Sequence, residues 1–213
     1  MALVASSIED SVLNFAKRWN FDEYARITEL FHEPPLRVEL IDGVIVEQLS
    51  LHLDRILSIR LTADAVRSIF GPAFDVNTNL PTRMGDDSAP KPDVTVLQGQ
   101  PRHFENRWPE AYEIPLVVEV ADSRPDTARG AKIRIYARFG IAEYWILDLR
   151  KRILEVRRGP LPDEQQWTET RIYQESESIT PLGTSGTAIL ISDLLPRLQG
   201  NPSVPELADS KTM

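Results

Sequence analysis

The sequence predicts an α/β protein in which a mixed central β-sheet is flanked by helices. Two observations carry this prediction. The stretch 116–122, LVVEVAD, is a nearly continuous run of aliphatic residues, which is typical of a strand buried on both faces. Segments with helical periodicity at 51–70 and 127–140 are interspersed with strand-like segments, as expected when helices cover the faces of one sheet.

Residues 21–198 are predicted to form a single domain. The chain has 213 residues, of which 42% are hydrophobic and 26% charged, and this is enough to bury a core. Residues 1–20 are a predicted N-terminal extension, which lacks the basic start of a signal peptide. Residues 199–213 are polar and contain two prolines, so we expect a flexible C-terminal tail.

The composition excludes several kinds of site and partner. Without cysteine the protein has no disulfide, thiolate zinc site or cysteine nucleophile, which fits a cytoplasmic protein. No apolar run approaches the roughly 18 residues of a membrane span. The net charge of −8 argues against tight, nonspecific binding of nucleic acid, although a local basic face is compatible with it.

The first predicted elements are a helix at 21–30 and a hairpin at 36–48. Asp42 and Gly43 separate two alternating apolar runs, and this dipeptide favours a two-residue type I′ turn. The turn places Ile41 opposite Val44 and, two residues further from the turn, Glu39 opposite Val46. Glu39 therefore shares an apolar face of the hairpin.

An amphipathic helix is predicted over 51–70, ended by Gly71 and Pro72. Its expected apolar face consists of Leu53, Ile56, Leu57, Leu61 and Val66. A short strand follows at 92–97, with Asp93 at its start.

The second half of the chain begins with the strand at 116–122. A helix is predicted at 127–140, with Asp126 or Thr127 as the N-cap and Gly140 just past its end. Two strands around a basic turn follow at 142–158, and Asp148 is expected to end the first of them. Further strands are predicted at 171–174 and 187–191, before a final helical turn at 192–198.

Three acids lie on these strands or at their starts: Glu39, Asp93 and Glu119. Lys132 lies on the helix after the Glu119 strand, on the face that also holds Ile135, Tyr136 and Phe139. Magnesium takes oxygen ligands from one or two carboxylates and keeps several waters. A lysine beside such a site can orient or help deprotonate a water, or stabilise phosphate charge. The set suits phosphodiester hydrolysis.

Each of these residues also has a structural interpretation. Glu119 could lie at a sheet edge or pair with an arginine, Asp93 could simply begin a strand, and Lys132 could extend along the helix flank to solvent. The three histidines show no metal-ligand spacing. His52 opens the long helix, where a structural role is favoured over a substrate contact. Glycine-rich phosphate loops, G-x-S-x-G and H-E-x-x-H do not occur.

Four segments, in this order, resemble the Uma-two family of putative restriction endonucleases, which belongs to the PD-(D/E)XK nuclease superfamily. They are RVELIDGVIVEQ, KPDVTVL, LVVEVADS and RGAKIRIYARFGIAEYWILDL. The resemblance covers roughly residues 21–195 and implies a restriction-endonuclease-like core with Mg²⁺ as cofactor, for which Mn²⁺ could substitute. The family is widespread in bacteria.

The resemblance also implies roles for individual residues. Asp93 takes the place of the first acid and Glu119 that of the second, as metal ligands, and Glu39 takes the glutamate of the E-L-I-D-G motif. The superfamily's usual lysine position, two residues after the second acid, holds Ala121. Lys132 is the natural replacement, reaching in from the following helix.

The resemblance further implies a DNA endonuclease, and a nuclease that cuts both strands commonly works as a homodimer. Arg129, one turn before Lys132, and His52, at the start of the long helix, are candidate substrate contacts. The alternative is a catalytically weak or inactive nuclease-fold module that binds nucleic acid or protein. A glycosidase with two carboxylates is less favoured, since no aromatic sugar platform lies near the acids. On the endonuclease interpretation, replacing Lys132 by alanine should abolish cleavage while leaving the melting temperature nearly unchanged.

Overall fold

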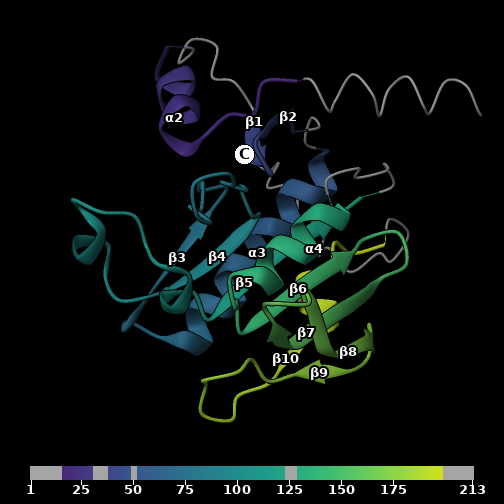
Figure 1. Ribbon diagram of the computed structural model, residues 1–213. Helices are drawn as coiled ribbons and strands as arrows, with labels where there is room; N and C mark the ends of the chain where they lie inside the picture. Colours follow the sequence, from purple (N-terminus) through teal and green to yellow (C-terminus); the bar gives the residue numbers. More distant parts are fainter. Residues whose placement is uncertain (1–15, 31–37, 49–51, 123–128, 199–213) are drawn as a thin grey trace, which may run out of the picture.

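The computed structural model describes residues 16–30, 38–48, 52–122 and 129–198 (Figure 1). Its helices are α2 (Phe21–Leu30), α3 (Leu53–Phe70) and α4 (Arg129–Arg138). The larger strands are β1 (Val38–Ile41), β2 (Val44–Glu47), β3 (Phe74–Thr78), β4 (Val94–Gln98), β5 (Leu116–Ala121), β6 (Glu143–Asp148), β7 (Ile153–Leu161) and β8 (Gln166–Gln174). The short elements are β9 (Ser178–Ile179), β10 (Ile189–Leu190) and the 3₁₀ turns η1 (Pro101–Phe104), η2 (Ala111–Glu113) and η3 (Ile191–Leu194).

The central sheet has six strands in the order β3-β4-β5-β6-β7-β8. Its neighbours are antiparallel except for β5 and β6, which run parallel and are joined by α4. A parallel pair needs such a crossover, whereas antiparallel strands can be joined by tight turns. The predicted α/β class with a mixed central sheet is confirmed.

The alternation of side chains along β5 divides the core into two layers. Leu116, Val118 and Val120 face α3, where they pack with Val66 and Phe70. The other side of β5 faces α4, in a cluster that contains Val117, Ala121, Ile135, Tyr136 and Tyr144. Glu119 has the same parity as Val117 and Ala121, so the fold directs it toward α4.

The β1–β2 hairpin has the predicted register, with Ile41 opposite Val44 and Glu39 opposite Val46. Both turn residues have positive φ, 46° at Asp42 and 77° at Gly43, as the predicted turn requires. The hairpin lies beyond one end of the central sheet (Figure 1). Backbone hydrogen bonds between Leu40 and Ala89 hold it to the segment that leads into β4.

The helix predicted at 21–30 is confirmed as α2, and it covers the outer side of this hairpin. The Tyr24 hydroxyl donates a 3.0 Å hydrogen bond to the Val38 carbonyl. Phe21 and Tyr24 pack with Leu40 and Ala89 in a small separate core. The hairpin is therefore held firmly enough to position a side chain on its other face.

Helix α3 begins and ends near the predicted residues, but the predicted apolar face is wrong. Leu53 is 78% exposed, and Ile56 and Leu57 are also exposed. Apart from Val66, which was predicted correctly, the buried residues are Ser58, Ile59, Thr62, Ala63 and Phe70. Apolar residues occur around most of this helix, so periodicity alone does not determine which side packs on the sheet.

The second half of the chain largely matches the predicted elements. Helix α4 ends before Gly140, whose φ is 71°, and Asp148 ends β6 by accepting a hydrogen bond from the backbone of Lys151. The 171–174 strand is the end of the longer β8, and the last predicted strand is reduced to β10 followed by η3. The predicted N-cap of α4, residues 1–15 and the tail lie outside the described residues.

Among the helices of the described part of the chain, none combines the length and apolar character needed to cross a membrane.

The corrected face of α3 predicts unequal costs for two similar truncations. Replacing buried Ile59 by alanine should lower the free energy of unfolding by about 3 kcal/mol, because it leaves a cavity beneath the sheet. Replacing exposed Leu57 by alanine should cost less than about 1 kcal/mol. Urea unfolding of both variants measures the difference, and equal costs would contradict the packing of α3 described above.

Candidate active site

The structure brings the four principal predicted residues to one end of the central sheet. Glu39 comes from β1, Asp93 directly precedes β4, Glu119 lies in β5 and Lys132 in α4. Because β4 and β5 are antiparallel, the start of β4 lies beside the end of β5. All four side chains are buried, with at most 5% of any residue exposed.

Lys132 bridges two of the acids. Its Nζ lies 2.9 Å from Glu39 Oε2 and 3.0 Å from Glu119 Oε1. One turn further along α4, the Tyr136 hydroxyl donates a 3.0 Å hydrogen bond to the same Glu119 oxygen. The helical spacing that placed Lys132 on the packing face of α4 therefore delivers two donors to Glu119.

Glu39 joins the hairpin to the sheet as well as to α4. Its Oε2 accepts a 3.0 Å hydrogen bond from the backbone N–H of Lys91, two residues before Asp93. Ile41 and Val46, on the same face of the hairpin, pack into the apolar cluster beneath α4. The apolar face predicted for the hairpin is thus the face that contacts α4, with Glu39 as its polar member.

Asp93 has different partners. Its Oδ2 accepts a 2.6 Å hydrogen bond from the backbone N–H of Val120, the residue after Glu119. The guanidinium of Arg55, from the first turn of α3, places Nη2 3.0 Å from both carboxylate oxygens. Sequence analysis missed Arg55, since one arginine in an amphipathic helix carries no signal of the acid that it meets.

Burial and neighbouring charges shift the pKa values of both Glu119 and Lys132. Burial raises the pKa of Glu119 to about 7; Lys132 opposes this rise, while the neighbouring Asp93 and Glu39 add to it. Burial lowers the pKa of Lys132, but Glu119 and Glu39 raise it by more, and the net direction is upward. Lys132 is therefore an ammonium at neutral pH, where it can orient a group or stabilise negative charge but does not accept a proton.

The donor atoms of Asp93 and Glu119 determine which kind of cation could bind between them. Asp93 and Glu119 offer carboxylate oxygens only, which suits a hard cation such as Mg²⁺ rather than zinc. Within the described residues, no group of three or more histidine, aspartate or glutamate side chains is arranged so that it could hold a metal ion. Two carboxylates nonetheless meet the requirement of Mg²⁺, which keeps several waters.

The two predicted substrate contacts lie at the starts of the two helices. His52 is the N-cap residue of α3 and lines a hollow of about 480 Å³ together with Arg55, Asp122 and Arg150. Arg129 is the first described residue of α4, three positions before Lys132. Their contact with a substrate stays a prediction.

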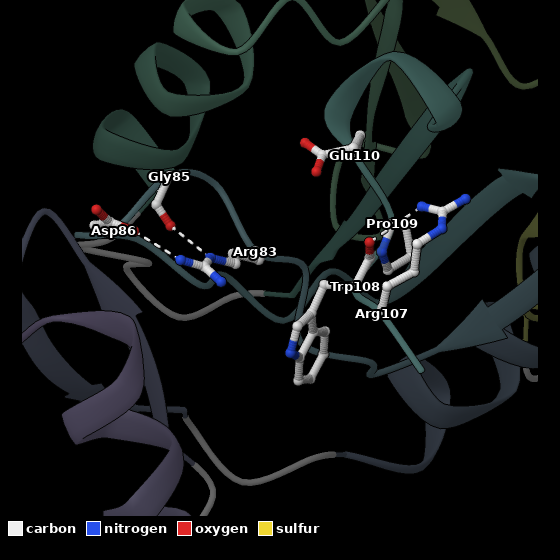
Figure 2. A pocket seen from close by; sticks show the side chains of 7 residues that line it. All are labelled: Arg83, Gly85, Asp86, Arg107, Trp108, Pro109 and Glu110. Carbon is white, nitrogen blue, oxygen red and sulfur yellow. Dashed lines mark hydrogen bonds and ion pairs between the residues drawn. The ribbon is translucent and has the colours of Figure 1, made fainter. Parts of the chain in front are cut away.

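A second hollow, of about 530 Å³, is lined by seven residues (Figure 2): Arg83, Gly85, Asp86, Arg107, Trp108, Pro109 and Glu110. The Arg83 guanidinium donates hydrogen bonds to the Asp86 carboxylate at 2.7 Å and to the Gly85 carbonyl at 3.2 Å. Arg107 is paired with Glu113. Both arginines that line this hollow are thus occupied by protein acceptors, and we assign it no role in the site.

A comparison with protein-family models identifies the family of the chain. A model described as "Uma2: Putative restriction endonuclease" matches residues 21–192. The chain belongs to the Uma2 family. Glu39, Asp93, Glu119 and Lys132 all lie within the part of the chain that the Uma2 model matches.

The fold of this Uma2 protein is similar to a solved structure. The match is the crystal structure of a putative nuclease of DUF820 from Anabaena variabilis ATCC 29413, with a TM-score of 0.65 and 19% sequence identity. The alignment covers 82% of this chain and 96% of the other. The predicted nuclease-like fold is therefore confirmed. A search of curated protein sequences finds no match.

The burial of Lys132 overturns the expectation that its removal leaves stability unchanged. Lys132→Ala would leave Glu39 and Glu119 buried without their common cation, so we expect a loss of about 3–5 kcal/mol in the free energy of unfolding. Urea unfolding in the presence of a chelator measures it. Lys151→Ala, which removes a side chain that is 71% exposed, is the matched control and should change stability by less than about 1 kcal/mol.

The raised pKa of Glu119 predicts a pH dependence of stability in chelated protein. The folded state holds this proton up to a pH of about 7, whereas the unfolded state loses it near 4.5. The folded state thus binds more protons between these values, and the free energy of unfolding falls as pH rises through them. The contribution from Glu119 is on the order of 3 kcal/mol.

Unfolding of wild-type protein and Glu119→Gln, each at pH 5 and pH 8, isolates this contribution because glutamine does not titrate. The wild-type protein should lose more stability than the variant between the two pH values. Parallel pH profiles would show that Glu119 stays ionised throughout.

Proposed function

We propose that the protein is an endonuclease that hydrolyses phosphodiester bonds of DNA with a divalent cation, Mg²⁺ or Mn²⁺, held by Asp93 and Glu119. The observation that carries this proposal is the convergence of three acids and Lys132 at one end of the sheet, with Lys132 within 3.0 Å of two acids. Membership of the Uma2 family supports it.

The proposed roles follow from the contacts. A cation bound to two carboxylates would supply Lewis-acid polarisation of a phosphoryl oxygen and a bound water of lowered pKa. Lys132, held as an ammonium, would orient the attacking water or stabilise charge that develops on the phosphate. Glu39 would position Lys132 through the 2.9 Å contact, and Tyr136 would fix the orientation of the Glu119 carboxylate.

Glu143 provides a comparison within the same sheet, because it too is a buried glutamate in an apolar strand. Its carboxylate is held by Arg158 at 2.6 Å, by the Trp145 indole N–H at 2.9 Å and by the Leu182 backbone N–H at 2.6 Å. This acid stands apart from the other carboxylates and has the partners of a structural residue. Glu119 differs because two further acids lie near it.

One observation favours the alternative of a non-catalytic module. Asp93 is already neutralised by Arg55, and Glu119 by Lys132, so the cluster is nearly balanced without a metal. The net charge of −8 also gives no general attraction to DNA.

A homodimer belongs to the endonuclease proposal. One active site cuts one strand, so two chains would be needed to cut both strands of a duplex.

Plasmid nicking in Mg²⁺ or Mn²⁺ tests the proposal. Wild-type protein should nick a supercoiled plasmid and lose this activity when the cation is chelated. Asp93→Asn should reduce the rate by at least about 100-fold, because it removes a charged ligand of the cation. Calorimetric titration should show weaker Mn²⁺ binding by this variant.

Asp64→Asn is the matched control, because Asp64 is an exposed aspartate whose side chain is 77% accessible. It should nick plasmid at the wild-type rate. Equal rates for wild type and Asp93→Asn would identify the activity as a contaminant. Absence of nicking by cation-loaded wild-type protein would favour the non-catalytic module.

A further inference from the structure

Arg55 makes only partial use of its guanidinium in binding Asp93. A single nitrogen, Nη2, lies 3.0 Å from both carboxylate oxygens. An arginine that serves only as a structural partner of a carboxylate commonly offers two parallel N–H groups, as Arg107 does toward Glu113. The geometry at Asp93 leaves most of the donors of Arg55 directed elsewhere.

One of these donors is buried and unsatisfied. Arg55 Nε has no hydrogen-bond partner among the described residues, although its atom is shielded from solvent. A buried N–H without an acceptor is costly, and such a group in a native protein calls for an explanation. A missing acceptor, such as a phosphate oxygen, would satisfy it.

The charges of the cluster also favour a phosphate as the missing partner of Arg55. With Glu39, Asp93 and Glu119 ionised, the cations of Lys132 and Arg55 leave one net negative charge. A divalent cation on Asp93 would displace Arg55, and the three acids, Lys132 and the cation would then be neutral together. The displaced Arg55 would carry an unpaired positive charge, which a phosphodiester monoanion would balance.

A hollow next to Arg55 could receive its displaced side chain. Arg55 lines the hollow of about 480 Å³ at the start of α3, beside Arg150 and His52. Leu53 and Leu149 form the apolar part of the lining of this hollow, and Asp54 and Asp122 are the acidic residues that line it. Arg55 is 18% exposed in its side chain, so the guanidinium already borders this space.

We propose that Arg55 is a substrate-binding residue that exchanges partners: it binds Asp93 in the metal-free protein and, when a divalent cation occupies Asp93, binds a phosphate of the nucleic-acid strand in the adjoining hollow. This inference rests on the proposed function. It adds a residue that competes with the cation for Asp93 in the metal-free protein and binds the substrate phosphate once the cation is bound.

The first test is cation affinity measured by calorimetry with Mn²⁺ alone. Arg55→Gln removes the competing cation, and the dissociation constant for Mn²⁺ should fall by about 10-fold, as expected when a charge-assisted contact need no longer be broken. Arg60→Gln, an exposed arginine on the same helix, makes the same charge change and should leave the affinity within about two-fold of wild type. A folded Arg55→Gln with unchanged or weaker Mn²⁺ affinity overturns the proposal.

The second test is DNA binding by fluorescence anisotropy, with a short duplex and with Ca²⁺, a hard cation that takes the same oxygen ligands. Wild type and Arg60→Gln should bind DNA more tightly when Ca²⁺ is added. Arg55→Gln should bind DNA about 10-fold more weakly than wild type in Ca²⁺, despite its tighter cation site. Wild-type affinity in this variant would identify Arg55 as a structural partner of Asp93 only.

A measurement on wild-type protein covers the case in which Arg55→Gln does not fold without a cation. The Arg55 side-chain N–H signal in an NMR spectrum is identified by its loss in Arg55→Lys, which keeps the charge. It should shift on addition of Mg²⁺ and shift again on addition of DNA. A signal that responds to neither overturns the exchange.

These outcomes separate the exchange from the proposed hydrolysis. If wild type fails to nick plasmid but Arg55→Gln binds Mn²⁺ more tightly and DNA more weakly, the exchange stands and hydrolysis is wrong. If wild type nicks plasmid but Arg55→Gln matches it in both affinities, hydrolysis stands and the exchange is wrong.

Discussion

The buried ammonium of Lys132 is the contact on which the rest of the candidate site depends. It lies between carboxylates from two different parts of the fold, Glu39 in the hairpin and Glu119 in the sheet. An ammonium removed from water is stable only when such partners compensate it. The hairpin is therefore bound to α4 by charge as well as by the packing of Ile41 and Val46.

Much of this arrangement could be predicted from the sequence because it follows from local geometry. The turn at Asp42 and Gly43 fixes the hairpin register, and this register determines the face on which Glu39 lies. Strand alternation places Glu119 on one side of the sheet, and helical spacing places Lys132 on the packing face of α4. Each of these steps depends on neighbouring residues only.

Arg55 and the buried face of α3 could not be predicted in this way, because both depend on tertiary contacts. Several apolar residues of α3, including Leu53 and Leu57, lie outside the core, while Ser58 and Thr62 lie within it. The side of α3 that meets the sheet is selected by the shape of the facing layer. That selection also determines where the first turn of the helix, and hence Arg55, meets Asp93.

The order of these elements along the chain has a consequence for the protein while it is being made. The hairpin, α3 and the strands of Asp93 and Glu119 leave the ribosome before α4, and β6, which holds β5 from its other side, leaves after α4. Glu119 and Glu39 consequently have no common cation in the nascent chain. The cluster can close only once α4 has crossed the sheet, so a partly synthesised chain carries Glu39 and Glu119 without the ammonium that joins them in the folded protein.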